Sequence, residues 1–369
     1  MKTPFDSAER LLARAFARVR DSTTLPPEGL PVYRILFGLY LLLFELPTFQ
    51  WIAGTPDAFY SPPVFSLGSL FDGFPGRPVL VLVDVLLVVA VSAITLGVRA
   101  RWAAFAFVGV FIYATTFKYS FGKVSHPLMT SVFLLCFSAT NWGTRHALLP
   151  DPPVRHPEIG PALAGVFLCF GMLSAGIPKA LGWVDFDLDT SGFLNWLYSG
   201  YYLFHRDQLL LPLAFHFPSG LLEIFDYIVV LFECSAFFWL LLGRKYWLGW
   251  LLVAASFHLG TTLFFNIHFL PHAVLYLGFA SLPGAIQKTT RWRRPFWGLA
   301  VVAAIIHLIL RLAGHPADFL LVPVELRPAA APVHAAMFVW IVVLFILAWN
   351  VRHHAQTEKL TSKEEYRFD

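Results

Sequence analysis

The stretch Pro78–Leu96, PVLVLVDVLLVVAVSAITL, decides the fold class of this chain. It contains a single charged side chain, Asp84, in an otherwise almost entirely apolar run. A helix of this length rises about 28 Å, because each residue adds ~1.5 Å, and the hydrocarbon core of a bilayer is ~30 Å thick. The stretch is therefore predicted to be a transmembrane helix.

The composition of the whole chain agrees with this prediction. Of its 369 residues, 57% are hydrophobic and only 14% are charged, and Phe alone occurs 37 times. A soluble globular protein carries roughly 25% charged residues, so a soluble enzyme is excluded, as are a disordered chain, a collagen and a coiled coil. The three cysteines lie inside apolar runs without the spacing of a disulfide framework or a metal site, so no metal ion is expected. A polytopic membrane protein remains.

The fold that we predict is all-α, a membrane helical bundle of about ten transmembrane helices with both termini on the cytoplasmic side. A spanning helix needs ~20 mostly apolar residues, with a range of ~17–25. The shortest segments are marginal in length, so nine spans are the alternative. The predicted spans are Pro31–Phe49, Pro78–Leu96, Trp102–Phe117, Leu128–Trp142, Pro161–Ala180, Leu222–Leu242, Trp247–Phe265, Phe269–Leu282, Phe296–Leu312 and Pro332–Trp349.

The basic residues favour this orientation. Most of the 27 Lys and Arg residues fall in segments that the ten-span arrangement puts inside, as the positive-inside rule requires. The net charge of +4 is thus explained by topology, and no nucleic-acid partner is expected. The lipid bilayer is the expected partner, and the bacterial inner membrane is the expected location.

Four regions follow from this arrangement. Residues 1–29 form a cytoplasmic N-terminal segment, in which Phe5–Val19 has the periodicity of an amphipathic helix on the membrane surface. Residues 30–285 form the main membrane domain, residues 286–350 hold two further spans, and residues 351–369 form a cytoplasmic tail. In the longest external connection, the aromatic stretch Gly192–Phe204 is predicted to be an interfacial helix or re-entrant segment over the bundle.

Ionisable side chains in or beside the spans are few, and such residues are the default candidates for function. Several of them fall toward the external side in the ten-span arrangement. A lysine desolvated there beneath an aromatic cover can act as a base near neutral pH, which favours a site for an aromatic or quinone-like ligand. These external residues are Lys118, Lys123, His126, Lys179, His268 and His272.

Four segments share the order and rough spacing of one family. They are YRILFGLYLLLFELP from Tyr33, FGKVSHPLM from Phe121, SAGIPKALGW from Ser174 and FHLGTTLFFNIHFLP from Phe257. Together they resemble the HTTM-type membrane domain, which vitamin K-dependent gamma-carboxylase shares with its bacterial relatives. The resemblance runs from about residue 26 to about residue 283.

The resemblance implies a chemistry. In the carboxylase a lysine deprotonates reduced vitamin K, oxygen adds, an epoxide forms, and the strong base so generated takes a proton from a protein glutamate. The matching lysine here is Lys179, and the matching histidines, His126 and His258, are further catalytic candidates. A reduced vitamin K or another quinol is the implied cofactor. The candidate cofactor-binding residues are Arg34, Glu233, Trp183, Trp196 and Tyr198.

This chain departs from the carboxylase in two places. The stretch from Lys179 to Trp183 is one residue shorter, and no counterpart of the large external peptide-handling domain follows Pro283. The resemblance therefore implies quinol oxidation or epoxidation at the external side rather than carboxylation of a protein glutamate.

Each candidate also has a structural interpretation. Lys179 can be an interfacial lysine at a helix end, His258 a hydrogen-bonded core histidine, and His126 a turn or capping residue. Arg34 can pair with an acid such as Glu45 or Glu233. Asp84 and His307 are expected to be packing or pore-lining polar groups, and Trp196 and Tyr198 can belong to an interfacial aromatic belt.

Two functions of other classes stay open. The chain can be a non-enzymatic membrane component, such as a maturation, export or immunity partner of a secreted peptide. It can also be a transporter, although the sequence lacks the paired repeats and matched Gly/Pro-broken helices typical of that class.

Overall fold

The computed structural model describes residues 4–122, 127–185, 187–206, 209–281, 293–323, 326, 328 and 330–365. Over these residues the chain is mostly helical, and seven helices are long and apolar enough to cross a membrane. The count rises to eight if one bent helix pair forms a single span. The chain is therefore an all-α protein of the multi-pass membrane class, as its composition predicts.

The chain folds as two compact units, which we describe separately. Unit 1 contains residues 1–24, 161–280 and 330–369, and unit 2 contains residues 25–160 and 281–329. The last two long helices belong to different units: the helix at 293–312 lies in unit 2, and the helix at 331–365 lies in unit 1.

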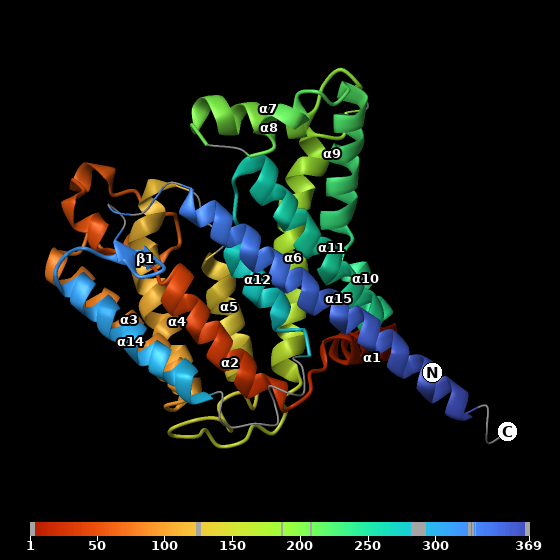
Figure 1. Ribbon diagram of the computed structural model, residues 1–369, viewed down its shortest axis with the longest axis horizontal. Coiled ribbons are helices and arrows are strands. Elements are labelled where there is room, and N and C mark those ends of the chain that lie inside the picture. Colours follow the sequence, from red (N-terminus) through yellow and green to blue (C-terminus); the bar gives the residue numbers. More distant parts are fainter. Residues whose placement is uncertain are drawn as a thin grey trace. The chain divides into compact units, whose positions relative to one another are not determined.

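Unit 1 is built around α6 (Ile159–Gly182), α11 (Arg244–Phe265) and α15 (Ala331–Glu365). Figure 1 shows α11 beside α15, and these two helices contact each other along much of α11. The shorter elements of this unit are α1 (Pro4–Thr23), α7 (Gly192–Tyr198), the π-helix η6 (Ser199–Leu203), α8 (Leu211–Ala214), α9 (Ser219–Cys234), α10 (Ala236–Leu242) and α12 (Leu270–Leu277).

Unit 2 is built around α3 (Arg77–Leu96) and α4 (Ala100–Lys118), which pack against each other, with α14 (Arg293–Leu312) on the other side of α3. The Pro of α3 stands at the start of that helix, and Gly97 ends it in the left-handed region at φ 71°, where a glycine has no steric penalty. Its remaining elements are α2 (Gly29–Tyr40), α5 (Pro127–Ser138), the short helices η1 (Leu41–Glu45), η2 (Gln50–Gly54), η3 (Asp57–Phe59), η4 (Leu67–Leu70) and η5 (Tyr119–Phe121), and the antiparallel strands β1 (Ala317–Phe319) and β2 (Val322–Pro323).

Two of the ten predicted spans correspond to short helices. The predicted span Leu128–Trp142 coincides with α5, which has 12 residues, and Phe269–Leu282 coincides with α12, which has 8 residues. At ~1.5 Å per residue these helices are about 18 and 12 Å long, well short of a ~30 Å hydrocarbon core. Neither helix reaches the length of a spanning helix.

A third predicted span, Leu222–Leu242, is broken in two. α9 and α10 meet at Ser235 with a bend of 50°. The Ser235 hydroxyl donates back to the Phe232 carbonyl at 3.1 Å and accepts from the Trp239 indole at 3.1 Å. A serine hydroxyl that bonds back to a preceding helical carbonyl competes with the backbone hydrogen bonds of the helix, and Ser235 makes such a bond at the break.

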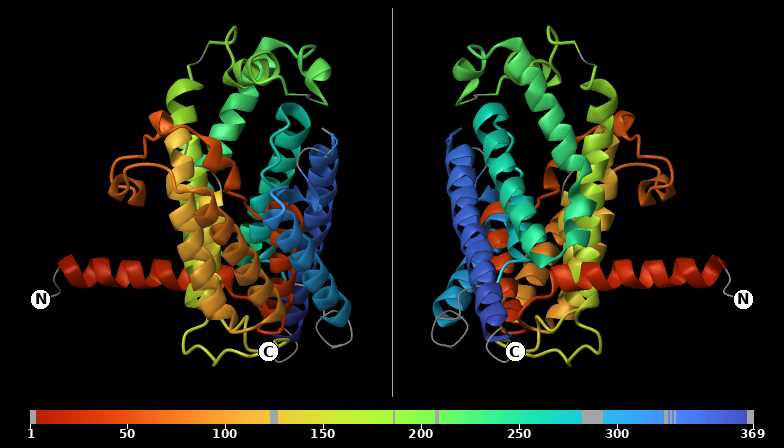
Figure 2. Two further views of the ribbon diagram at one scale, coloured as in Figure 1. Left: turned by 90° about the vertical axis from the view of Figure 1, so that its left-hand side faces the viewer. Right: turned by 90° about the vertical axis from the view of Figure 1, so that its right-hand side faces the viewer.

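The N-terminal segment forms the helix that its periodicity predicts. α1 is anchored to unit 1 by its last turn, where the Ser22 hydroxyl donates to the Leu240 carbonyl at 2.7 Å. The rest of α1 extends away from α10 and α11 (Figure 2). Its apolar side chains Leu11 and Leu12 are 69% and 70% exposed.

Candidate functional site

The site begins at the C-terminal end of α6, where Lys179 lies in the last turn. One turn earlier, Gly176 lets α9 approach closely, because a Cβ at this position would lie 2.8 Å from the Cys234 Sγ and 3.0 Å from the Glu233 Cβ. A larger residue than glycine would push α9 away from α6. This small contact brings Lys179 to Glu233.

Lys179 and Glu233 form an ion pair inside unit 1. The Lys179 Nζ donates to both carboxylate oxygens of Glu233, and its distance to Oε2 is 2.6 Å. The Glu233 side chain is 4% exposed and that of Lys179 is 21% exposed. Because the pair lies between two candidate spans, each charge depends on the other for compensation.

Trp183 covers the lysine. The Lys179 Nζ lies 5.5 Å from the centroid of the Trp183 ring, a cation–π geometry, and the Trp183 ring meets that of Trp196 edge to face at 6.5 Å. Gly192 fits against the same indole, since a Cβ there would lie 2.3 Å from a Trp183 ring atom. The aromatic segment after α6 therefore folds back onto the end of the helix that carries Lys179.

Asp226 of α9 holds this segment in place. One carboxylate oxygen accepts from the Ser191 hydroxyl at 2.9 Å and from the Gly192 N–H at 2.8 Å, and the other accepts from the Phe193 N–H at 2.8 Å. The carboxylate thus satisfies amides at the start of α7 that have no partner within the helix. Most of the stretch Gly192–Phe204, for which we predicted an interfacial helix or re-entrant segment, is helical, in α7 and η6.

His258 belongs to a second cluster of unit 1. Its Nε2 shares a hydrogen bond of 2.8 Å with the Tyr276 hydroxyl, and its ring lies 5.2 Å from that of His272 and 5.3 Å from that of Trp340. Trp340, on α15, also donates its indole N–H to the His268 carbonyl at 2.8 Å. His258 is 3% exposed, so the cluster is buried.

Lys179, Glu233, Trp183 and Trp196 therefore lie together in unit 1. His258 belongs to the separate cluster, in which it is hydrogen-bonded to Tyr276.

The other predicted site residues lie elsewhere or outside the described residues. Tyr198 stacks on Phe215 at 5.3 Å and on Tyr202 at 6.0 Å, on the far part of the aromatic segment. Arg34 belongs to unit 2, where it donates to the Ile94 carbonyl at 2.7 Å and to the His146 carbonyl. Arg34 thereby caps the end of α3. Its hydrogen bonds go to backbone carbonyls, and not to the carboxylates of Glu45 or Glu233 with which we expected an ion pair. His126 lies outside the described residues.

Sequence reasoning gave no role to Asp226, Tyr276 and Trp340. Asp226 is an acid inside the predicted span Leu222–Leu242, which was the one signal available for it. Tyr276 follows His272 by four residues on α12, a spacing that puts the two on one helix face. Trp340 carried no signal, because it lies in the last long helix, beyond the segments that resemble the family.

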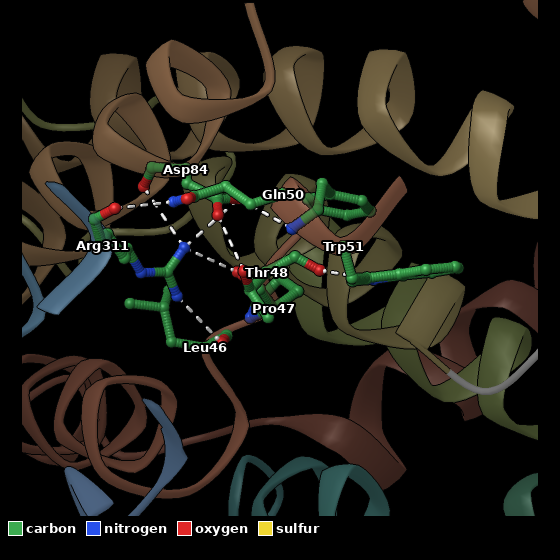
Figure 3. A network of polar contacts seen from close by, with 8 residues as sticks. Leu46, Pro47, Thr48, Gln50, Trp51, Asp84 and Arg311 are labelled. Atoms are coloured by element: carbon green, nitrogen blue, oxygen red, sulfur yellow. Dashed lines mark hydrogen bonds and ion pairs between the residues drawn. The ribbon is translucent and has the colours of Figure 1, made fainter. Parts of the chain in front are cut away.

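Unit 2 contains a polar cluster of its own, centred on Arg311 and Asp84 (Figure 3). The Arg311 Nη1 lies 3.4 Å from an Asp84 carboxylate oxygen, and both side chains are fully buried. Arg311 also donates to the carbonyls of Leu46 and Pro47, at 3.1 and 2.9 Å. Arg311 thus holds the backbone at Leu46 and Pro47, where the first long helix ends.

Asp84, which we expected to be a packing or pore-lining polar group, completes this arrangement. Its carboxylate accepts from the Thr48 hydroxyl at 2.7 Å and from the Phe49 N–H at 2.9 Å. His307, one turn before Arg311, shares a hydrogen bond of 2.6 Å with the Leu42 carbonyl in the π-helix η1. These side chains form hydrogen bonds with backbone N–H and C=O groups that have no partner within the helix once it ends. The cluster therefore has a structural role.

No family model matches this sequence, and neither a search of curated proteins nor a search of solved structures found a match. Among the described residues, no group of three or more His, Cys, Asp and Glu side chains is arranged to hold a metal ion. Of the arrangements described here, the Lys179–Glu233 pair with its aromatic cover is the best suited to catalysis or ligand binding.

Proposed function

We propose that this chain is a ten-span protein of a bacterial inner membrane, with both termini inside, and that Lys179 acts on a quinol at its external side. The orientation rests on the positive-inside distribution of the basic residues. The seven long helices and the bent pair α9–α10 account for up to eight spans. The ten-span count adds the segments around the short helices α5 and α12, and for these it rests on the hydropathy of the predicted spans Leu128–Trp142 and Phe269–Leu282. The chemistry rests on one observation, the Lys179–Glu233 pair beneath Trp183.

The pair can supply a base without any outside reagent. In apolar surroundings a charged Lys–Glu pair costs desolvation energy, so the neutral pair, with the proton moved to the carboxyl group, approaches it in energy. With its proton moved to Glu233, Lys179 presents a neutral amine at the aromatic cover. That amine can accept a proton from a hydroxyl group placed within ~3 Å.

The residues around Lys179 fit an aromatic ligand. Trp183 and Trp196 present two rings edge to face, with the amino group beside one of them. Aromatic side chains are the usual contacts of a flat ring in a pocket. A reduced naphthoquinone such as reduced vitamin K, or another quinol, would supply the redox chemistry. Lys179 would hold its hydroxyl proton, and Trp183 would orient its ring.

His258 serves this proposal as a positioning residue. Its imidazole shares a hydrogen bond with the Tyr276 hydroxyl, and this bond orients both side chains in the buried cluster of unit 1. His126 keeps its proposed catalytic role from the family resemblance alone. Arg34 contributes to the proposal only as a residue that stabilises unit 2.

The test is mass spectrometry of the full-length protein, purified in detergent, for a bound quinone, together with quinol oxidation and epoxidation assays. We expect bound quinone and turnover in the wild type and neither in Lys179→Ala. Lys118→Ala is the matched control, because Lys118 also ends a candidate span but is exposed. Full quinol turnover by Lys179→Ala would refute the role of Lys179.

A transporter is the second candidate, and the bent pair α9–α10 favours it. Discontinuous helices often form the substrate sites of transporters near the middle of the membrane. Here the break at Ser235 lies two residues after Glu233 in the sequence. In a transporter the same pair would hold a charged substrate. A protein without bound quinone or quinol turnover would then move this substrate across a reconstituted vesicle membrane, and Lys179→Ala would not.

A further inference from the structure

The buried face of α9 is acidic. The buried residues of this helix are Leu222, Glu223, Asp226 and Glu233, so three of the four are carboxylates. Residues three and seven apart lie on the same side of a helix, which puts the three carboxylates in one row. A charge inside a membrane span is costly, and each of these groups therefore needs a partner.

Two of the three carboxylates have partners in the structure. Glu233 pairs with Lys179, and Asp226 accepts three hydrogen bonds from the start of α7. Glu223 is different. Its side chain is fully buried, at 0% exposure, and neither carboxylate oxygen has a hydrogen-bond partner in the part of the chain that the structure describes.

The electrostatic surroundings of Glu223 make this more costly. Asp226, one turn along the same buried face of α9, carries a charge of the same sign. The helices of unit 1 that pack on α9 include α7 and α10, and neither contains a Lys, Arg or His. The nearby Lys179 is engaged with Glu233, about 15 Å along the helix from Glu223 at ~1.5 Å per residue.

We infer that Glu223 is the binding site of one small cation, either a proton or Na⁺. The partner is small, because the carboxylate has no exposed surface at which a larger cation could bind. It carries one charge, because Glu223 is the one carboxylate of the row without a partner among the described residues. A divalent metal ion fits less well, since the described residues offer no group of three acidic, His or Cys ligands.

This site is separate from the proposed quinol chemistry. A buried carboxylate in a span that takes up and releases a cation is the usual link between a membrane protein and an ion gradient. Asp226 lies one turn from Glu223 and also anchors α7. Occupation of Glu223 by a cation therefore lowers the repulsion on the carboxylate that holds the aromatic segment in place.

Labelling with dicyclohexylcarbodiimide tests the inference on the full-length protein in nanodiscs. This reagent adds to protonated carboxyl groups in apolar surroundings, and peptide mass spectrometry then identifies the modified residue. We expect Glu223 to be modified in sodium-free buffer at mildly acidic pH. Asp189, which is exposed on the loop before α7, is the internal control and should be modified several-fold less, because the reagent needs a carboxyl group in apolar surroundings.

Two conditions distinguish the cations. If a proton is the ligand, labelling falls several-fold between mildly acidic and mildly alkaline pH and does not respond to Na⁺. If Na⁺ binds, NaCl protects Glu223 several-fold at constant pH, and KCl does not. Absence of labelling at Glu223, or labelling that changes with neither pH nor Na⁺, overturns the inference.

Glu223→Gln separates this site from the quinol site. The variant removes the adduct and any Na⁺ protection, while quinone binding and Glu233 labelling stay at wild-type levels. A variant that loses bound quinone together with the adduct would show that Glu223 belongs to the Lys179 site, which also overturns the inference. Thermal unfolding of Glu223→Gln confirms that the variant is folded.

Discussion

The Lys179 amino group donates to both carboxylate oxygens of Glu233, across 54 residues of sequence, at a point where α6 and α9 approach closely. Gly176 permits this approach, and Trp183 covers the amino group from the other side. The pair thus joins a helix contact, an ion pair and an aromatic surface at one place in unit 1. Its energetic weight can be measured directly.

Lys179→Met should destabilise the protein by about 3 kcal/mol, because it leaves the Glu233 charge buried without compensation. The value lies at the low end of the range for buried pairs, since the Lys179 side chain is 21% exposed. The double variant Lys179→Met/Glu233→Leu should recover most of this loss, because it removes both charges. Denaturant unfolding in detergent measures the three proteins. Equal stability of all three proteins would show that the pair contributes nothing.

Asp226→Asn should loosen the aromatic segment without unfolding the bundle. An asparagine keeps one acceptor oxygen but turns an NH₂ group toward donors at the start of α7, so about 1–3 kcal/mol is lost locally. Amide hydrogen exchange over Gly192–Tyr198 should become faster, while exchange in α11 stays unchanged. Asp189→Asn, on the exposed loop before α7, is the control and should leave exchange as in the wild type.

A pair of glycines tests how closely the segment fits Trp183. Gly192→Ala should displace the segment at a cost of about 1–3 kcal/mol, because the new Cβ would lie 2.3 Å from the indole. Gly182→Ala meets nothing within 4 Å and should be neutral or slightly stabilising. Trp fluorescence and thermal unfolding measure both variants. If they behave alike, the contact between Gly192 and Trp183 does not constrain the segment.

The fold class could be predicted from the sequence because hydrophobicity and helix length are local properties. The spans at Pro78–Leu96 and Trp102–Phe117 correspond to α3 and α4 with shifts of only a few residues at their ends. The bend at Ser235 could not be predicted, because hydropathy reports the length of an apolar run and not the direction of the helix axis. The short α12 follows a left-handed residue at Phe269, a conformation that hydropathy does not report.

The partners of the polar residues were harder to predict than the residues themselves. Lys179 and Glu233 both stood out as ionisable groups in a hydrophobic chain, yet their pairing depends on the register of α6 against α9. Arg34 was expected to meet an acid and instead binds backbone carbonyls at the end of α3. A guanidinium can satisfy either kind of acceptor, and only the three-dimensional arrangement decides between them.

The N-terminal helix leads to a prediction about the membrane surface. Leu12 is 70% exposed, and Arg10 and Arg14 lie on the opposite face of α1. A helix of this kind lies in the interface of an anionic membrane with its apolar face inward. A fluorophore attached at Leu12→Cys should therefore shift to the blue in vesicles with anionic lipid, and one at Arg14→Cys should not. An equal response at both positions would contradict an interfacial α1.

The Arg311–Asp84 cluster offers the sharpest contrast with the Lys179 site. Both sites contain a buried ion pair. Arg311 also donates to the Leu46 and Pro47 carbonyls, so it stabilises the backbone at the C-terminal end of a helix. Arg311→Met should therefore cost about 3–5 kcal/mol, because it leaves Asp84 without its cation and two carbonyls without a donor. Protein that folds at low temperature should keep its full content of bound quinone, measured by mass spectrometry per folded molecule. A folded Arg311→Met protein that has lost its quinone would move the functional site from Lys179 to unit 2.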